Sequence, residues 1–145
     1  MPYLTRKKIK PGLFLEQTLD FKAGASVFFL GRIRGHSSGK EVAYLEYTAY
    51  EALAETRIAD LISEAAGRWG VLDSRVLHRL GRLDLGEIAV MIEVRSGHRE
   101  EAYQTSRFLI EGIKHQVPIW KKEYFKDGTS AWGGCRHEDS AYVGI

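Results

Sequence analysis

Hydrophobic and β-branched residues gather in short blocks along the chain, and two early blocks predict β-strands. Residues 25–33 (ASVFFLGRI) and 42–50 (VAYLEYTAY) are rich in aromatic and β-branched side chains, which favour a largely buried strand. Between them, residues 35–40 (GHSSGK) have the glycine and serine content of a loop. The sequence therefore predicts two strands joined by a short connection.

Apolar residues recur at helical spacing over residues 51–69, and this stretch predicts an amphipathic helix that ends at Gly70. Two further strands are predicted over residues 75–83 and 88–95. The residues between them, 84–87 (DLGE), are typical of a hairpin turn. The middle of the chain is thus expected to be a helix followed by a hairpin.

A second helix is predicted after Ser96, a candidate N-cap, with Glu100 and Glu101 in the first turn, where the helix dipole favours acids. Pro118 cannot continue a helix, so residues 117–125 (VPIWKKEYF) are expected to be extended. The inward stripe of this helix comprises Ala102, Ser106, Leu109, Ile110 and Ile113.

The predicted order is strand, strand, helix, strand, strand, helix, strand. This order indicates an α+β fold, with two helices packed on a mainly antiparallel sheet. The length of 145 residues fits a single domain, residues 1–145. Within it, residues 1–12 form a basic N-terminal arm, and residues 133–145 show no clear period and are expected to be a mobile tail unless a partner orders them.

Composition narrows the class of protein. Hydrophobic residues make up 44% of the chain and charged residues 28%, as in soluble globular domains. No apolar run reaches the ~18–20 residues that a membrane span needs, and the single cysteine, Cys135, cannot form an internal disulfide. The basic start resembles a signal peptide, but the apolar stretch after it is short. We therefore expect a cytoplasmic protein that does not bind membranes.

The net charge of +2 hides a gradient along the chain. Residues 1–40 contain eight Lys and Arg against two Asp and Glu, a net +6, whereas residues 41–101 contain seven against twelve. A basic third of this kind fits an anionic partner, such as a phosphate, a nucleic acid or an acidic protein. The alternative is a solvated basic arm, which we favour for residues 6–10.

Several standard sites are excluded. Residues 35–41 superficially resemble a phosphate-binding P-loop, but the spacing is one residue short and Glu41 stands where Ser or Thr is required. No G-x-G-x-x-G opens a helix, so the dinucleotide fingerprint is missing. The five histidines are scattered, and Cys135 with His137 offers at most two close metal ligands. We predict no metal site and no cofactor.

Cationic side chains gather where predicted elements end. Arg32, Arg34 and His36 alternate, so an extended backbone would project them on one face, as an anion seat or as charges that protect an edge strand. Residues 96–99 (SGHR) stand where a strand passes into a helix, and backbone amides there with His98 and Arg99 can bind an anion. The alternative for residues 96–99 is an ordinary capping turn.

Two lysines flank the proline that ends the second helix. If the chain doubles back at Pro118, Lys114 and Lys121 face one pocket, and burial with like-charge repulsion eases the loss of a proton from one of them. A neutral lysine can act as a base or a nucleophile. The alternative is a helix C-terminal lysine that complements the dipole and a surface lysine beyond it.

Four other residues carry weaker signals. Trp69, Trp120 and Trp132 are interpreted as core anchors. His78 lies within a predicted strand, and an inward histidine would need a hydrogen-bond partner that the sequence does not identify.

Five motifs in order resemble one known family. They are residues 31–36 (GRIRGH), 45–50 (LEYTAY), 76–81 (VLHRLG), 96–99 (SGHR) and 114–123 (KHQVPIWKKE). Together they are similar to the large, catalytic subunit of molybdopterin synthase over about residues 13–132. This resemblance implies an α/β hammerhead fold with additional antiparallel strands.

The resemblance also implies a function. Members of the family are sulfurtransferases that convert cyclic pyranopterin monophosphate into molybdopterin by installing a dithiolene. The sulfur arrives as a thiocarboxylate on the C-terminal Gly-Gly of a small ubiquitin-like subunit. Two large subunits form a central homodimer and bind one small subunit at each end, which makes a heterotetramer.

The family's site residues transfer by position. Lys114 and Lys121 match its two active-site lysines. We hypothesise that Lys121 orients the thiocarboxylate and transfers protons and that Lys114 stabilises the anionic intermediate. We expect the two lysines to converge with Arg34, His98 and Arg99 around one anionic small molecule. Arg34, His98 and Arg99 match its substrate-pocket residues, and Arg136 matches an arginine donated across the dimer. The chain departs from the family pattern from residue 133 onward.

Two rival functions follow from the residues alone. A noncatalytic module could hold RNA or an acidic protein on the basic N-terminal third, which predicts steep salt dependence and indifference to the two lysines. A sulfur carrier could work through a persulfide on Cys135, which predicts loss of function in Cys135→Ser.

Overall fold

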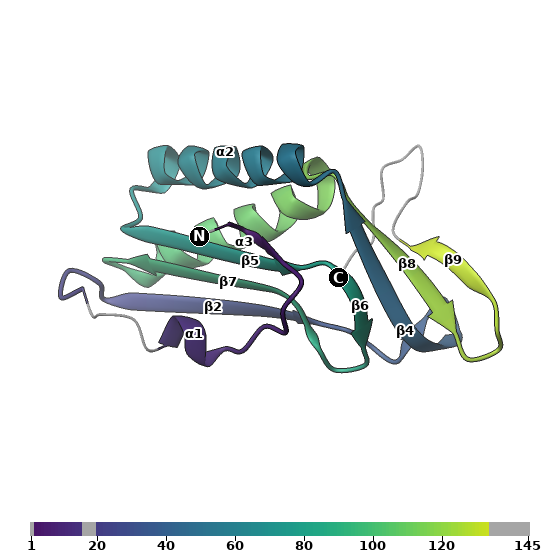
Figure 1. Ribbon diagram of the computed structural model, residues 1–145. Coiled ribbons are helices and arrows are strands. Elements are labelled where there is room, and N and C mark those ends of the chain that lie inside the picture. The colour runs from purple at the N-terminus through teal and green to yellow at the C-terminus, as the bar shows by residue number, and fades with distance from the viewer. Residues whose placement is uncertain (1, 16–19, 134–145) are drawn as a thin grey trace.

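The computed structural model describes residues 2–15 and 20–133, which form two sheets and three helices (Figure 1). The elements in chain order are β1 (Leu4–Thr5), α1 (Gly12–Leu15), β2 (Ala25–Arg32), β3 (His36–Ser37), β4 (Lys40–Ala49), α2 (Glu51–Trp69), β5 (Asp73–Arg79), β6 (Gly81–Asp84), β7 (Ile88–Ser96), α3 (Arg99–Gln116), β8 (Ile119–Phe125) and β9 (Ser130–Gly133). The predicted α+β class is confirmed.

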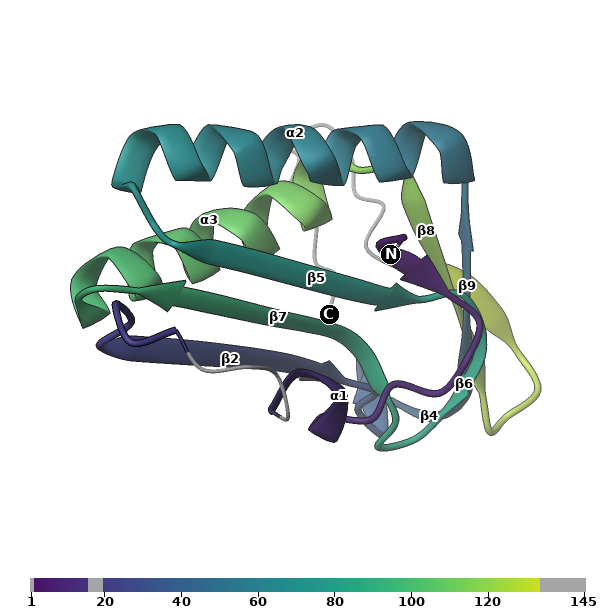
Figure 2. The same ribbon diagram turned by 60° about the vertical axis from the view of Figure 1, so that its left-hand side comes forward.

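The first sheet has the strand order β1-β5-β7-β2, in which only β1 runs parallel to its neighbour. The long helices α2 and α3 cover one of its faces, and the short α1 lies on the other (Figures 1 and 2). Because both faces are covered, every residue of β7 except Arg95 is buried. This sheet and its helices form the main core.

The second sheet stands at one end of the first. Its order is β3-β4-β8-β9, and β6 also pairs with β4. Side chains alternate across its strands, so one face turns inward and the other faces solvent. The inward face carries the functional site described below.

The helices match the predicted pattern closely. On α2 the buried stripe is Ala54, Ile58, Leu61 and Ala65, and the helix ends at Gly70 in a left-handed conformation with φ of 62°. Gly112 of α3 faces Leu61, and a Cβ at this glycine would lie 2.7 Å from Leu61 Cδ2. The lack of a side chain there lets the two helices approach closely, and the predicted inward stripe of α3 is buried as expected.

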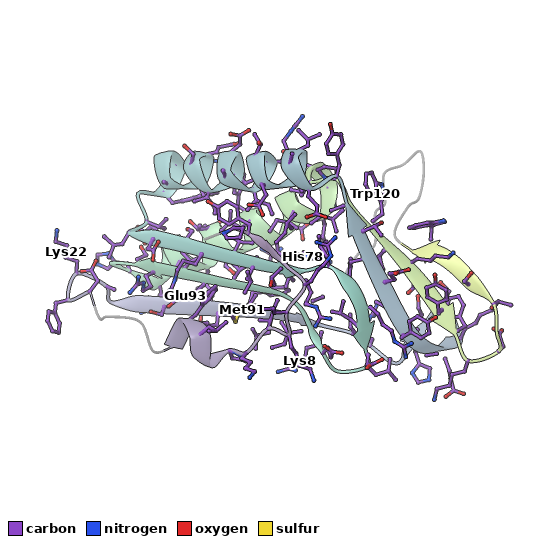
Figure 3. All side chains as sticks on the ribbon, viewed as in Figure 1. Lys8, Lys22, His78, Met91, Glu93 and Trp120 are labelled. Carbon is purple, nitrogen blue, oxygen red and sulfur yellow. The ribbon has the colours of Figure 1, made fainter. Side chains whose placement is uncertain are left out.

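The N-terminal arm packs against the domain along part of its length. Leu4 and Ile9 are buried, while Lys7, Lys8 and Lys10 remain exposed. Ile9 joins a small cluster on the α1 side of the first sheet that includes Met91, and Figure 3 shows Met91 and Glu93 on this side above Lys8. The arm is thus anchored by its apolar residues, and its lysines face solvent.

One predicted strand, residues 75–83, is wrong, because the structure divides it into β5 and β6. Gly81 has φ of 92°, and the chain leaves the first sheet there to pair with β4 in the second. The turn at residues 84–87 therefore joins strands of different sheets and does not close a hairpin. Leu80 and Leu83 are buried on either side of the break, so apolar residues continue through it, which is why periodicity alone missed it.

The predicted N-cap is also wrong. Ser96 is the last residue of β7 and pairs with Ala25, and the N-cap of α3 is His98, with an extended backbone (φ −133°, ψ 153°). Pairing with β2 holds Ser96 extended, and the helix begins at Arg99, two residues later than predicted. The short elements β1, α1, β3 and β9 were not predicted, since two to four residues are too few to show a period.

The tryptophans behave differently from the core anchors we expected. Trp69 is half-buried and packs edge-on against Phe108 at 5.3 Å between ring centroids. Trp120 (Figure 3) and Trp132 are 44% and 55% exposed, on the outer side of the second sheet. Only Trp69 supports the core as predicted.

Candidate active site

A cavity of about 470 Å³ opens on the inward face of the second sheet. Arg34 and His36 line it from the connection after β2, Lys121 and Glu123 from β8, and Gly133 from the end of β9. Residues far apart in the sequence thus line one cavity, because β8 pairs with the distant strand β4 and with β9.

Lys121 lies at the base of this cavity and is only 6% exposed. The alternation of β8 turns Lys121 and Glu123 inward and Trp120 and Lys122 outward. In register, Lys121 stands opposite Tyr47 on β4 and Gly133 on β9. The strand period therefore places a buried ammonium group against the cavity.

Burial lowers the pKa of Lys121 from its ordinary value. The Glu123 carboxylate opposes this by favouring the charged form, whereas the cations Arg34 and Lys114 lower the pKa further. The ammonium can thus lose its proton more readily than a surface lysine can, which suits proton transfer.

Lys114 lies in the last turn of α3 and is half-buried. Burial lowers its pKa, Glu111 acts in the opposite direction, and Arg34 lowers it again. The helix ends at Val117, the backbone turns extended before Pro118, and β8 begins at once. This reversal places Lys114 near Lys121 and Arg34, as their mutual electrostatic effects show.

The alternation of Arg32, Arg34 and His36 persists beyond the end of β2, with Ile33 buried between exposed neighbours. Arg34 and His36 reach the main cavity. Arg32 instead donates a hydrogen bond to the Gly86 carbonyl at 2.9 Å and so stabilises the turn between β6 and β7. Of the three residues of the predicted anion seat, Arg34 and His36 line the cavity and Arg32 does not.

His98 and Arg99 do not join this group within one chain. Both are exposed at the start of α3, and Lys114 lies fifteen residues further along the helix, roughly 22 Å at 1.5 Å per residue. Figures 1 and 2 show the two ends of α3 at opposite ends of the first sheet. The expectation that Lys114, Lys121, Arg34, His98 and Arg99 converge around one small molecule is therefore not met within a single copy of the chain. Arg136 and Cys135 lie outside the described residues.

Sequence reasoning missed Glu123 and Gly133. Glu123 is 7% exposed, two residues after Lys121 on the same strand, so the period of two could have identified it. Gly133 belongs to β9, and nothing in the sequence indicates that this four-residue strand pairs with β8.

The structure also supplies the hydrogen-bond partner that the sequence did not identify for His78. Its Nδ1 donates to the Arg79 carbonyl at 2.8 Å.

Two negative findings apply to residues 2–15 and 20–133. No group of three His, Cys, Asp or Glu side chains is placed to hold a metal ion. No helix in this part of the chain is long and apolar enough to cross a membrane.

Comparison with known proteins places the chain in a family. A family model described as MoaE protein matches residues 4–116, and the chain belongs to this family. The molybdopterin synthase catalytic subunit of Thermoplasma volcanium is 41% identical over 129 residues, which cover 89% of this chain and 94% of that protein. The resemblance stated from the sequence motifs is thus confirmed.

Solved structures agree. Molybdopterin synthase from Staphylococcus aureus superposes with a TM-score of 0.85 at 38% identity, covering 92% of this chain and 97% of that one. A more distant neighbour, the complex of subunits 1 and 2 of molybdopterin-converting factor from Helicobacter pylori 26695, shares the fold with a TM-score of 0.73 at 22% identity, covering 89% and 87%.

Proposed function

We propose that this chain is the catalytic subunit of a molybdopterin synthase that acts in the cytoplasm. It converts cyclic pyranopterin monophosphate into molybdopterin with sulfur from the C-terminal thiocarboxylate of a small ubiquitin-like subunit. The single observation that carries this proposal is the buried Lys121 at the base of a cavity that also holds Arg34, in a chain of the MoaE family.

The charges of the cavity fit the proposed reactants. The substrate carries a cyclic phosphate and the sulfur donor a thiocarboxylate, and fixed cations stabilise both anions. Lys121 orients the thiocarboxylate and transfers protons during attack on the pterin side chain. Lys114 stabilises the anionic intermediate, and Arg34 binds the phosphate.

The enzyme needs no sulfur of its own in this scheme. The partner's carbonyl carbon carries the sulfur, so the protein positions the reactants and moves protons. Cys135 has no assigned role.

The charges of the N-terminal third support the enzyme over an RNA-binding module. Arg6 pairs with Glu51 at 2.7 Å and Lys40 with Asp127 at 3.5 Å, while Arg34 faces the cavity. The net +6 of residues 1–40 is therefore divided among separate surfaces and partners, whereas nucleic-acid binding depends on a continuous basic face.

A homodimer is part of the proposal, because it accounts for His98 and Arg99. In an isologous dimer whose two-fold axis crosses the middle of α3, the start of one α3 lies beside the end of the other. A groove of about 450 Å³ lies at that midpoint, between edge strand β2 and α3. Its lining is mixed: Val27, Phe29, Tyr103 and Ile110 with Ser106, Arg107 and Glu111. This groove supports a contact in which each copy supplies His98 and Arg99 to the other copy's lysine pocket.

Reconstitution tests the proposed function. The purified chain is mixed with a thiocarboxylated small subunit and cyclic pyranopterin monophosphate, and the dithiolene product is measured. We expect product that depends on the thiocarboxylate, with none formed when the small subunit ends in an ordinary carboxylate. Failure of a small subunit that binds the chain to yield product would contradict the proposal.

A further inference from the structure

Gly133 lies in direct contact with the two buried charged residues of β8. It pairs with Lys121 at the end of β9. A Cβ atom built on Gly133 would lie 2.8 Å from Glu123 Oε1 and 2.9 Å from Lys121 Cε. Real Cβ atoms essentially never come within 3.0 Å of a non-bonded heavy atom of another residue, so any side chain here would force these groups to move.

The backbone of Gly133 does not itself require glycine. Gly39, Gly70 and Gly128 have positive φ angles, which L-residues rarely adopt, whereas Gly133 does not belong to that set. Glycine is therefore explained at this position by the lack of room for a Cβ atom, since the side chains of Lys121 and Glu123 already occupy that volume.

The atoms that would have to move are near the ends of flexible side chains. Gly24, in contrast, would meet the backbone carbonyl of Gly97 at 2.3 Å, and Gly112 would meet apolar Leu61. A side chain at position 133 thus displaces polar groups of the site and leaves the packing of the core intact.

We propose that Gly133 is a positioning residue of the active site, whose bare backbone fixes where the Lys121 ammonium and the Glu123 carboxylate lie in the cavity. This inference rests on the proposed function, since it concerns the same reaction. Gly133 touches neither reactant in this scheme and acts through its two neighbours on β8.

Charged and titratable groups face Lys121 from every element around it. Glu123 lies on the same strand, Arg34 follows β2, Lys114 ends α3, and Tyr47 stands opposite on β4. His36, from β3, lines the same cavity. Glu123 supplies the negative charge that raises the pKa of Lys121, so moving this carboxylate away lets the pKa fall.

The test compares Gly133→Ala with Gly67→Ala. Gly67 lies on the exposed side of α2, and a Cβ there would meet nothing within 4 Å, which makes it a matched control. We expect Gly133→Ala to lower kcat by about 10–100-fold through misplacement of the reacting groups. The limb of the pH–rate profile that reports the ionisation of Lys121 should move to lower pH. This shift is expected whether the charged or the neutral form of Lys121 is the active one. Gly67→Ala should keep both properties.

A double variant tests whether the effect passes through Glu123. In a Glu123→Ala background the carboxylate is already gone, so adding Gly133→Ala should reduce kcat less than it does in the wild type. Thermal unfolding accompanies each variant. If Gly133→Ala alone fails to fold, the kcat of Glu123→Ala and that of the double variant still decide. A role exerted through Glu123 predicts similar kcat in these two variants, and a further fall of about 10–100-fold in the double variant would contradict it.

The outcomes separate two failures. Wild-type kcat and an unmoved pH–rate limb in Gly133→Ala, or independent effects in the double variant, would overturn this inference while the proposed function stands. Wild-type turnover in Lys121→Ala would instead overturn the role on which the inference rests.

Discussion

Lys121 and His78 are two buried titratable residues that lie on either side of Tyr47. Lys121 is opposite Tyr47 in the β4–β8 pairing, and the His78 ring meets the Tyr47 ring edge-on at 5.0 Å between centroids. They are 6% and 2% exposed, and burial lowers the pKa of both, that of His78 to about 4. The same physical effect thus acts on neighbouring groups.

The surroundings of the two residues differ, and this difference decides whether the lowered pKa serves chemistry or affects only stability. Lys121 opens onto a cavity and feels the charges of Arg34, Lys114 and Glu123. His78 is enclosed, and its hydrogen bond runs to the Arg79 carbonyl. A buried titratable group therefore becomes a candidate for chemistry where it meets a cavity and other charges, and contributes to stability where it is sealed.

The largest expected effect comes from Lys121→Ala. Loss of one well-placed cationic donor commonly costs ~2.7–4 kcal/mol of transition-state stabilisation, so turnover should fall by roughly 10²–10³-fold. Lys122→Ala is the matched control, because Lys122 points outward over the Tyr124 and Trp132 rings at 5.2 and 5.6 Å. Product formation under saturating substrate measures both. Equal turnover in the two variants would contradict the assigned role.

The sealed histidine should act on stability. The pKa of His78 is about 4 in the folded protein and about 6.5 in the unfolded chain, so the unfolded state binds more protons between these values. Stability present above pH 6.5 is then lost as the pH falls toward 4, by about 3 kcal/mol from this group. Denaturant unfolding at several pH values measures the slope.

His78→Phe supplies the comparison for this slope. It keeps a ring of similar shape beside Tyr47 and removes the titration. The variant should lose less stability between pH 7 and pH 4 than the wild type does, even if it is less stable at pH 7. A slope identical to that of the wild type would show that other groups cause the pH dependence.

A smaller effect is expected from mixing two variants, an experiment that tests whether residues of both copies of the chain form the Lys121 cavity. Lys121→Ala and Arg99→Ala chains are each expected to be impaired. When they are unfolded together and refolded as a mixture, half of the dimers are mixed, and one of the two sites in each mixed dimer has both residues. About a quarter of wild-type activity should therefore return, if the two-fold arrangement holds. No recovery would indicate that Arg99 serves the pocket of its own chain or none.

The smallest effect is expected from Cys135→Ser, which should leave turnover unchanged. In the proposed function the sulfur is delivered on the partner's carbonyl, so no thiol of this chain is needed. The same reconstituted assay measures it. A loss comparable to that of Lys121→Ala would favour the persulfide carrier over the proposed function.

Local chemistry made the two long helices and their faces predictable. In α2 the apolar spacing and Gly70 define the stripe and the end. The division at Gly81 escaped prediction because apolar residues buried in the structure, Leu80 and Leu83, stand on both sides of it. The strand β9 escaped because its pairing with β8 depends on a partner strand that local sequence does not specify.

The candidate site divides in the same way. Pro118 predicted the reversal that brings Lys114 toward Lys121, since the signal is local. The separation of Arg99 from Lys114 follows from the length of α3, once the helix is known to be continuous. Glu123 and Gly133 became visible only when β8 and β9 were seen side by side.

The amino-acid sequence by itself determined the family, the two amphipathic helices and the cationic residues that the chemistry requires, because each depends on residue type and short-range spacing. The tertiary structure decided which of these cations share a cavity, which of them lie at the far end of α3, and which glycine leaves room beside Lys121. Those relations depend on how distant strands pair and on the volume left between them, and neither quantity is written in any local stretch of the chain.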